Sequence, residues 1–360
     1  MAYSKDKVVI QSRDGKSTQA LSSLNFSTFQ VTRTKNEAYQ VDFQAYDDGS
    51  LGFALLQVEN LVKYDGQTYV IKQVTDDNTG GVHNVTVTAT HIFYQLNNRF
   101  QYSIKTGTNS VNLTDALKFL FTGIGDGYSY QVHGKFNSNK TLTDFGNTSI
   151  IEGLSTIKSA FGVYAIVPDN KVIHLYDKDS YVTNTRKVFR YRNDTSAVQL
   201  QYDATSIVNT VQAVSTLEQP AFTPFKVQDA DSVAKWGIKE GVRVESDKIT
   251  STSAMKNLAS QSFVLEPSLA MTVTSAGNED VALGENWTVQ MIENGFQTAV
   301  EVVSIVKAPF ATTAVQITLN NTRKNYLDAQ KVQQATINTA KKNTETTGNM
   351  WVVGKVESWR

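Results

Sequence analysis

Cysteine is absent from the 360-residue sequence. Its absence excludes disulfide frameworks, thiol nucleophiles and zinc sites built on cysteine ligands. Long apolar runs are also missing: no window approaches the roughly 18 uninterrupted apolar residues typical of a membrane-spanning helix, and the N-terminus has no apolar stretch long enough for a signal peptide. We therefore expect a protein that is made and folded in a cytoplasm.

Neither sign of charge is in excess, because 34 Lys and Arg residues balance 34 Asp and Glu residues. A protein that binds nucleic acid regardless of sequence is expected to carry a basic excess, since its affinity comes from neutralising phosphates. The balance therefore argues against DNA binding as the main activity. At 360 residues the chain also exceeds the size at which a single core stops growing, so two or more domains are expected.

Proline is scarce, with 5 residues, whereas 15 Tyr and 17 Phe favour strands. Glycine and Asp/Asn clusters such as Asp47–Gly49 separate many of the alternating segments, as hairpins require. The sequence therefore predicts a mainly antiparallel β protein. Alternating apolar and polar residues recur in these segments: Phe26–Val31, Ala38–Ala45, Thr68–Val74, Val82–Thr90, Tyr164–Tyr176, Ser196–Tyr202, Ile207–Val214, Ala270–Thr274, Trp287–Ile292, Thr298–Val306 and Ala314–Leu319.

Helical patterns are few. Asn112–Phe121 predicts a short helix with leucines on one face, and Ser149 with Glu152 forms a capping-box signature at the start of a second helix. A third helix is expected over Thr252–Phe263. The stretch Thr322–Thr347 has helical composition but few apolar residues, so it predicts a helical tail without a strong core-facing stripe.

These patterns predict a mainly β fold with an α+β insertion: two antiparallel β-barrel-like domains, a small α+β domain and a C-terminal helix. The expected bounds are a first β-barrel domain over 1–105, an inserted α+β domain over 106–185, a second β-barrel domain over 186–321 with a small helical insertion near 229–263, and a helical tail over 322–360.

The sequence has no recognisable catalytic motif. Its histidines form neither an H-E-x-x-H nor an H-x-H pattern, and no G-x-S-x-G elbow is present. The glycine-rich stretch Thr122–Gly127 follows a predicted helix rather than a strand, so it predicts a turn and not a phosphate loop. We therefore predict no catalytic, cofactor-binding or metal-binding residues and no cofactor. The four histidines are His83, His91, His133 and His174.

Structural roles also account best for the conspicuous polar residues. Glu152 fits the capping box, and Asp177 with Asp179 stands at a strand end, where Asp commonly serves in turns. A carboxylate pair of the glycosidase kind cannot be recognised, because its roughly 5–10 Å spacing is spatial. His91 stands where the alternating run Val82–Thr90 breaks into an apolar cluster. We predict a packed, neutral histidine with a ring nitrogen bonded to backbone.

Five segments in order resemble one family. DGQTYVIKQV (Asp65–Val74) and VTVTATHIFYQL (Val85–Leu96) resemble the N-terminal hallmark of the phage tail-tip family known as tail-associated lysin, or prophage endopeptidase tail protein. The resemblance spans roughly residues 1–325 and depends on the order of several weak matches. The later matching segments are Asn147–Tyr181, Arg186–Ser215 and Ala282–Asn321.

The resemblance implies a baseplate hub. Two β-barrels per chain would let three chains close a pseudo-sixfold ring that matches the hexameric rings of a phage tail. Its partners would then be two further copies of the chain, the distal tail protein ring, and the tail tube or tape measure protein, with DNA only in passage and the host cell wall contacted indirectly. The expected location is the virion tail tip of a long-tailed phage, after assembly in the cytoplasm of a Gram-positive bacterial host. In this hub His91 is architectural.

Two alternatives remain open at this stage. Family members often continue into a peptidoglycan-cleaving domain or a fibre, whereas this sequence ends at Arg360. We therefore expect no enzyme here, and the competing hypothesis is a cell-wall hydrolase with an unrecognised carboxylate pair, which zymography would reveal. The second alternative is a carbohydrate-binding receptor module that stacks sugars on its 4 Trp and 15 Tyr residues, although aromatic residues at strand spacing more often form a core.

The tail generates the first prediction. Isolated helices gain most of their stability from packing, and Trp351 and Trp359 follow the weakly apolar helix near the terminus. We expect this segment to pack against its own or a neighbouring subunit, or to lead into a further domain. Deleting residues 326–360 should leave both β-barrels folded but weaken assembly, as measured by circular dichroism and light scattering. Cooperative unfolding or aggregation of the truncated chain would instead place the tail in the core.

Overall fold

The computed structural model describes residues 7–79, 81–192, 195–246, 249–275, 281–291, 296–310 and 316–321. Strands dominate these residues, which confirms the mainly β prediction. Each of the alternating segments predicted from the sequence contains strand residues in the structure. The predicted helical tail over 322–360, with Trp351 and Trp359, lies outside the described residues.

The N-terminal β unit is a seven-stranded region with the order β3-β4-β7-β6-β5-β1-β2. Its core contains Phe29, Phe43 and Tyr69, all almost completely buried. Asp65 and Gly66 form the two-residue turn between β5 and β6, and both have positive φ, as a tight hairpin turn requires. The elements are β1 (Val9–Gln11), β2 (Thr18–Ala20), β3 (Leu24–Thr34), β4 (Tyr39–Tyr46), α1 (Leu51–Ala54), β5 (Leu61–Tyr64), β6 (Gln67–Thr79) and β7 (Val82–His91).

The α+β unit packs two helices between a two-stranded and a three-stranded sheet, around a core that includes Leu117, Leu120 and Ile157. The predicted capping box is confirmed: the Ser149 side chain accepts from the Glu152 amide, and the Glu152 side chain accepts from the Ser149 amide. Its elements are η1 (Ile92–Asn98), β8 (Phe100–Val111), α2 (Leu113–Phe121), β9 (Ser129–His133), β10 (Lys140–Ser149), α3 (Ile150–Phe161), β11 (Ala165–Asp169), β12 (Val172–Tyr176) and α4 (Lys178–Tyr181).

The C-terminal β unit has the strand order β13-β19-β20-β21-β18-β14. Alternate residues of its strands point into a core in which the Trp287 and Phe189 rings stack with centroids 4.1 Å apart. Such stacked aromatic pairs contribute to stability beyond the area that they bury. The strands are β13 (Thr183–Arg190), β14 (Thr195–Asp203), β18 (Ser268–Ser275), β19 (Glu285–Met291), β20 (Phe296–Lys307) and β21 (Gln316–Asn321).

A small lobe between β14 and β18 differs from the sequence prediction. Its two helices fall within the predicted helical insertion near 229–263, but the lobe also has its own three-stranded sheet, β16-β15-β17. The alternating segment Ile207–Val214 therefore pairs within the lobe and not in the β unit, because β15 finds both partners locally. The lobe contains β15 (Thr210–Ser215), β16 (Phe225–Gln228), α5 (Ala230–Trp236), β17 (Val244–Ser246) and α6 (Thr252–Ser260).

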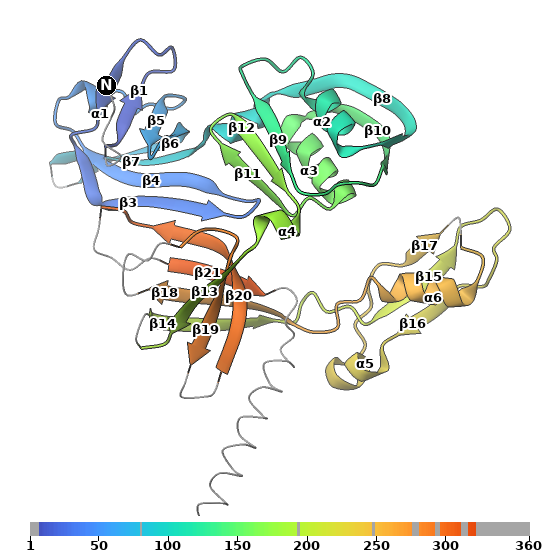
Figure 1. Ribbon diagram of the computed structural model, residues 1–360. Coiled ribbons are helices and arrows are strands. Elements are labelled where there is room, and N and C mark those ends of the chain that lie inside the picture. The colour runs from blue at the N-terminus through green and yellow to red at the C-terminus, as the bar shows by residue number, and fades with distance from the viewer. Residues whose placement is uncertain are drawn as a thin grey trace, which may run out of the picture.

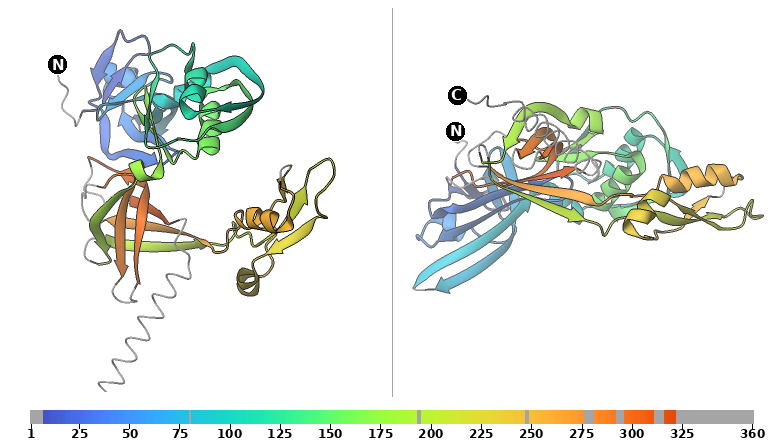
Figure 2. Two further views of the ribbon diagram at one scale, coloured as in Figure 1. Left: turned by 45° about the vertical axis from the view of Figure 1, so that its right-hand side comes forward. Right: turned by 90° about the horizontal axis from the view of Figure 1, so that it is seen from below.

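Three of the four parts lie close together, and the lobe stands apart from them (Figure 1). Figure 1 shows the N-terminal β unit beside the α+β unit, with the C-terminal strands below them and the lobe projecting to one side. The lobe has a separate hydrophobic core that includes Val211, Ala213 and Met255. Figure 2 also shows the β6–β7 hairpin extending beyond its neighbouring strands. The domain bounds expected at residues 105, 185 and 321 stay a proposal.

One pair of strands joins the two β units. β20 pairs antiparallel with β3, with Ser304 opposite Thr34 and Lys307 opposite Val31, so the two units form one continuous 13-stranded sheet. The Thr34 and Ser304 hydroxyls also lie 2.7 Å apart. Beyond β20, the Phe310 ring contacts Phe29 in the N-terminal core at 5.1 Å between centroids. The two β units are therefore connected by backbone and by side-chain contacts.

Candidate interaction surfaces

His91 is completely buried at the end of β7. Its ring stacks on Tyr39 at 4.4 Å between centroids, and its Nδ1 accepts the Phe93 amide hydrogen at 3.3 Å, which caps η1. Because Nδ1 accepts, the proton of the neutral ring lies on Nε2, which donates to the Gln67 Oε1 at 3.0 Å. This arrangement uses both ring nitrogens in holding two structural elements.

The surroundings of His91 favour its neutral form. Burial lowers the pKa of His91 to about 3, and the nearby positive charge of Arg33 acts in the same direction. A general base that works near neutral pH needs a pKa near the operating pH. His91 does not meet that requirement, so its burial and contacts agree with an architectural role.

The remaining histidines form no recognisable metal centre. His133 Nε2 lies 2.9 Å from His174 Nδ1, on neighbouring strands β9 and β12. His83 lies between the carboxylates of Asp47 and Asp76, and hydrogen bonds to them, Asp76 first, raise its pKa. No group of three or more potential ligands that could hold a metal ion occurs in the described part of the chain.

The acidic residues singled out in the sequence lie at helix starts. Hydrogen bonds from Thr148 and Ser149 lower the pKa of Glu152. The Asp177 side chain caps α4 by accepting from the Ser180 amide, and it also accepts from the Lys135 amide at 2.7 Å. Asp179 lies in the first turn of α4. Each position explains the residue structurally, and the absence of catalytic residues stays a prediction.

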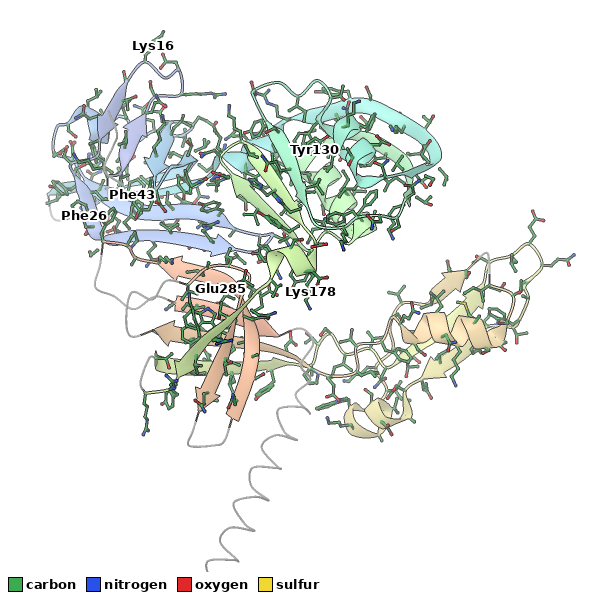
Figure 3. The ribbon with its side chains drawn as sticks, viewed as in Figure 1. Lys16, Phe26, Phe43, Tyr130, Lys178 and Glu285 are labelled. Carbon is green, nitrogen blue, oxygen red and sulfur yellow. The ribbon has the colours of Figure 1, made fainter. Side chains whose placement is uncertain are left out.

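A buried ionic cluster connects all three large units. Lys35, in the turn after β3, lies 2.8 Å from the Glu301 carboxylate on β20. Their side chains are only 17% and 10% exposed, so water screens this pair weakly. The Tyr164 hydroxyl of the α+β unit donates to the other Glu301 oxygen, and the Lys35 ammonium lies 4.0 Å from the Tyr164 ring centroid. Figure 3 shows Lys178 on α4, with Glu285 to its left among the C-terminal strands.

Two asparagines reinforce the contact between the N-terminal β unit and the α+β unit. Asn36 has a left-handed φ of 62° and bonds both the Tyr164 carbonyl and the Ile166 amide. Asn170, in the β11–β12 turn, donates from its side-chain amide to the Gly66 carbonyl, and its backbone N–H donates to the Gln67 Oε1. Sequence reasoning missed these residues, because Lys35-Asn36-Glu37 reads only as an ordinary turn.

Exposed apolar side chains mark two surfaces. On β8, Phe100, Tyr102 and Ile104 are 42%, 81% and 46% exposed and follow each other at alternate positions, so they form one stripe, here called the β8 stripe. On the lobe, Ile238 and Val242 are 60% and 87% exposed. Contiguous apolar patches of this kind mark interaction sites more often than scattered single residues do. No helix in the described residues is long and apolar enough to cross a membrane.

The sequence matches two profiles of one family of phage tail proteins. The profile of the prophage endopeptidase tail N-terminal domain matches residues 8–91, and that of the prophage endopeptidase tail matches residues 183–330, together more than half of the chain. The chain therefore belongs to the prophage endopeptidase tail family. Family membership supports a structural role in the tail tip of a phage. No curated protein matches the sequence significantly.

Solved tail proteins share this fold. The prophage tail protein gp18 from Listeria monocytogenes is 21% identical, with a TM-score of 0.68 over 93% of this chain and 100% of that chain. The tail protein from Neisseria meningitidis is 12% identical, with a TM-score of 0.61 over 90% and 98%. The 43 kDa tail protein of prophage MuSo2 from Shewanella oneidensis is 9% identical, with a TM-score of 0.62 over 88% and 98%.

The buried His91 predicts a loss of stability in acid. Its folded pKa of about 3 lies below the unfolded value, so the stabilising effect is complete above pH 6.5 and is lost as pH falls towards 3. Between about pH 7 and about pH 4.5 this residue should cost roughly 2–3 kcal/mol of unfolding free energy. Urea unfolding at both pH values should show a smaller acid loss for His91→Asn than for the parent protein.

The exposed His83 provides the control for that experiment. Because its pKa is raised, its contribution has the opposite sign and disappears as pH rises through the folded value. His83→Asn should therefore leave the acid loss intact or make it steeper. Equal acid losses in the parent protein and in His91→Asn would contradict the assignment.

The ionic cluster predicts a specific weak point. Glu301→Gln keeps the shape of the side chain but leaves the Lys35 ammonium without its carboxylate, which should cost about 2–4 kcal/mol of unfolding free energy. Glu59→Gln removes the partner of Lys72, an equally short but more exposed pair within the N-terminal unit, and should cost less than about 1 kcal/mol. Hydrogen exchange at the β3–β20 amides should quicken only in Glu301→Gln. Equal effects of the two substitutions would show that the ionic cluster does not stabilise the β3–β20 pairing.

Proposed function

We propose that the chain is a structural hub protein that forms a homotrimer at the tail tip of a long-tailed phage or prophage. The trimer caps the tail tube, docks on the ring of distal tail protein and contacts the tape measure protein. DNA crosses the hub only in passage. The protein is assembled in the bacterial cytoplasm and reaches the host cell wall as part of the virion tail tip.

The observation that carries this proposal is the pairing of β20 with β3. Each chain thereby contains two β units in one continuous sheet, so three chains supply six such units. A ring of six β units suits a tail built from hexameric rings. The buried Lys35–Glu301 pair supports the proposal, because it fixes the two units against each other before any partner binds.

The exposed surfaces support assembly. The β8 stripe lies on the α+β unit, and the apolar side chains Ile238 and Val242 lie on the projecting lobe, so two different parts of the chain offer apolar contacts. A stable interface buries roughly 1,200–2,000 Å² and places aromatic residues near its centre. Tyr102, which is 81% exposed, is the aromatic residue best placed to provide such a contact.

The proposed role does not include catalysis. The titratable side chains described above are used in caps, turns and the buried cluster, and the matched solved structures are tail proteins. Peptidoglycan hydrolysis, which the family name suggests, is therefore assigned to domains other than those described here. A cell-wall hydrolase and a sugar-binding module remain the competing proposals.

Assembly on the distal tail protein tests the hub proposal. Mixed with a preformed distal tail protein ring, the parent chain should bind as three copies per ring, measured by chromatography with light scattering. Tyr102→Ser should weaken this assembly at least about tenfold, because it removes a large apolar contact. Lys16→Ser, on an exposed turn of the N-terminal unit, is the matched control and should assemble normally. A chain that stays monomeric at high concentration with the ring present would overturn the proposal.

A further inference from the structure

Two cavities meet where the three large units join. The larger has a volume of about 380 Å³, the smaller about 200 Å³, and both are lined by Arg33, Tyr39, Val167, Tyr181 and Leu283. The larger volume falls within the size range of small-ligand pockets. Because their walls come from β3, β4, β11, α4 and the segment before β19, a ligand bound here would touch all three units at once.

The floor of the larger cavity is one face of the three neighbouring strands β20, β3 and β4, here called the seam. Arg33 lies opposite Tyr39 on β4 and opposite Ile305 on β20, so these three side chains share a face. Val31 and Lys307 extend the same face by one further pair. The floor is therefore apolar with basic groups at defined positions.

Arg33 is the polar centre of this floor. Its guanidinium carbon lies 4.5 Å from the ring centroid of Tyr39, which stacks one face of the group and leaves its N–H donors available. In the described part of the chain, no carboxylate lies within ion-pair distance of Arg33. The Glu301 carboxylate on β20 is bound by Lys35 and Tyr164. A half-buried guanidinium in this position is suited to an anion.

Tyr181, at the end of α4, supplies a second hydrogen-bond donor to the cavity. Its hydroxyl oxygen is buried and has no hydrogen-bond partner among the described residues. A buried hydroxyl without a partner is destabilising, and such groups call for an explanation such as a bound ligand. Burial raises the pKa of Tyr181, so the hydroxyl keeps its proton and can donate it. A side chain at Gly284 would come within 2.7 Å of the Tyr181 ring, so this glycine permits the ring to lie where it does.

The charges around the cavities favour an anion as well. Arg33, Lys35, Lys158 and Lys307 line them, against two carboxylates, Glu37 and Asp65. The Val31, Val167, Leu283 and Ile305 side chains also line the larger cavity and have no polar group to offer. The site thus combines a few convergent donors with an apolar lining, which is the usual composition of a small-ligand pocket.

We propose that this junction cavity binds a small organic anion, with its carboxylate or phosphate held by Arg33 and Tyr181 and its apolar body against the seam. Because such a ligand would bind only the folded chain and would touch all three units, it would stabilise their arrangement. The source is either a free small molecule or an acidic side chain from a neighbouring chain. The proposal does not depend on the hub function, since it concerns a site within one chain.

The test uses hexanoate as the probe, with 1-hexanol as its neutral counterpart and inorganic phosphate as an anion without an apolar body. Calorimetry on the isolated chain should show saturable hexanoate binding with a Kd of about 1 mM or tighter, and much weaker binding of hexanol. Phosphate binding comparable to that of hexanoate would show that the apolar wall does not contribute and would overturn the proposed ligand class. Absence of saturable hexanoate binding would overturn the proposal. Where hexanoate binds, its displacement by the distal tail protein or by self-association would identify an acidic side chain of a neighbouring chain as the source, and binding that neither displaces would identify a free small molecule.

Two variants assign the binding to this cavity. Arg33→Gln and Tyr181→Phe should each weaken hexanoate binding at least about tenfold. Tyr181→Phe should leave the thermal stability of the unliganded chain unchanged or raised, because the hydroxyl that it removes has no partner. Arg13→Gln, on an exposed turn of the N-terminal unit, is the control and should bind as the parent does. Equal binding by the parent and by both cavity variants would place hexanoate elsewhere and refute the proposal.

Discussion

The antiparallel pairing of β20 with β3 is the constraint on which the rest of this structure depends. It joins residues about 270 positions apart, and the entropy cost of closing such a loop grows only slowly with its length. The long separation of β3 and β20 therefore costs little free energy of folding. It slows folding instead, because non-local strand pairs require distant segments to meet. Once formed, the pairing joins the strands of the two β units into one continuous sheet, while each unit keeps its own hydrophobic core.

The seam also explains why the buried charges lie where they do. Lys35 follows β3 directly, Glu301 lies on β20, and Tyr164 approaches from the α+β unit, so the three meet only if the strands pair in this register. A one-residue slip would turn each strand's side chains to the opposite face and separate the charges. An ionic cluster of this kind adds less to total stability than to the choice of one arrangement, since a misplaced buried charge is costly.

The polar residues of this chain serve its architecture to an unusual degree. His91 uses both ring nitrogens to hold η1 and Gln67, Glu152 closes a capping box, and Asp177 binds two backbone amides. The β8 stripe and the lobe, in contrast, carry large apolar side chains that are exposed.

Local patterns in the sequence were sufficient for the strands that alternate apolar and polar residues, the capping box at Ser149 and the buried position of His91, because alternation, cap residues and apolar clusters act over a few neighbouring residues. They were insufficient for strands such as β8 and β10, which no alternating segment predicted. The position of β15 could not be predicted, because an alternating pattern indicates a strand but not the sheet to which it belongs. Pairing with β16 and β17 decided its place in the lobe. The sequence by itself determined the elements with a clear alternating or capping pattern and which side of each alternating strand is apolar. The tertiary structure alone decided which distant strands pair, because strand partners are chosen by packing between segments far apart in the chain. That pairing brings Lys35 to Glu301 and places Arg33 and Tyr181 at one cavity.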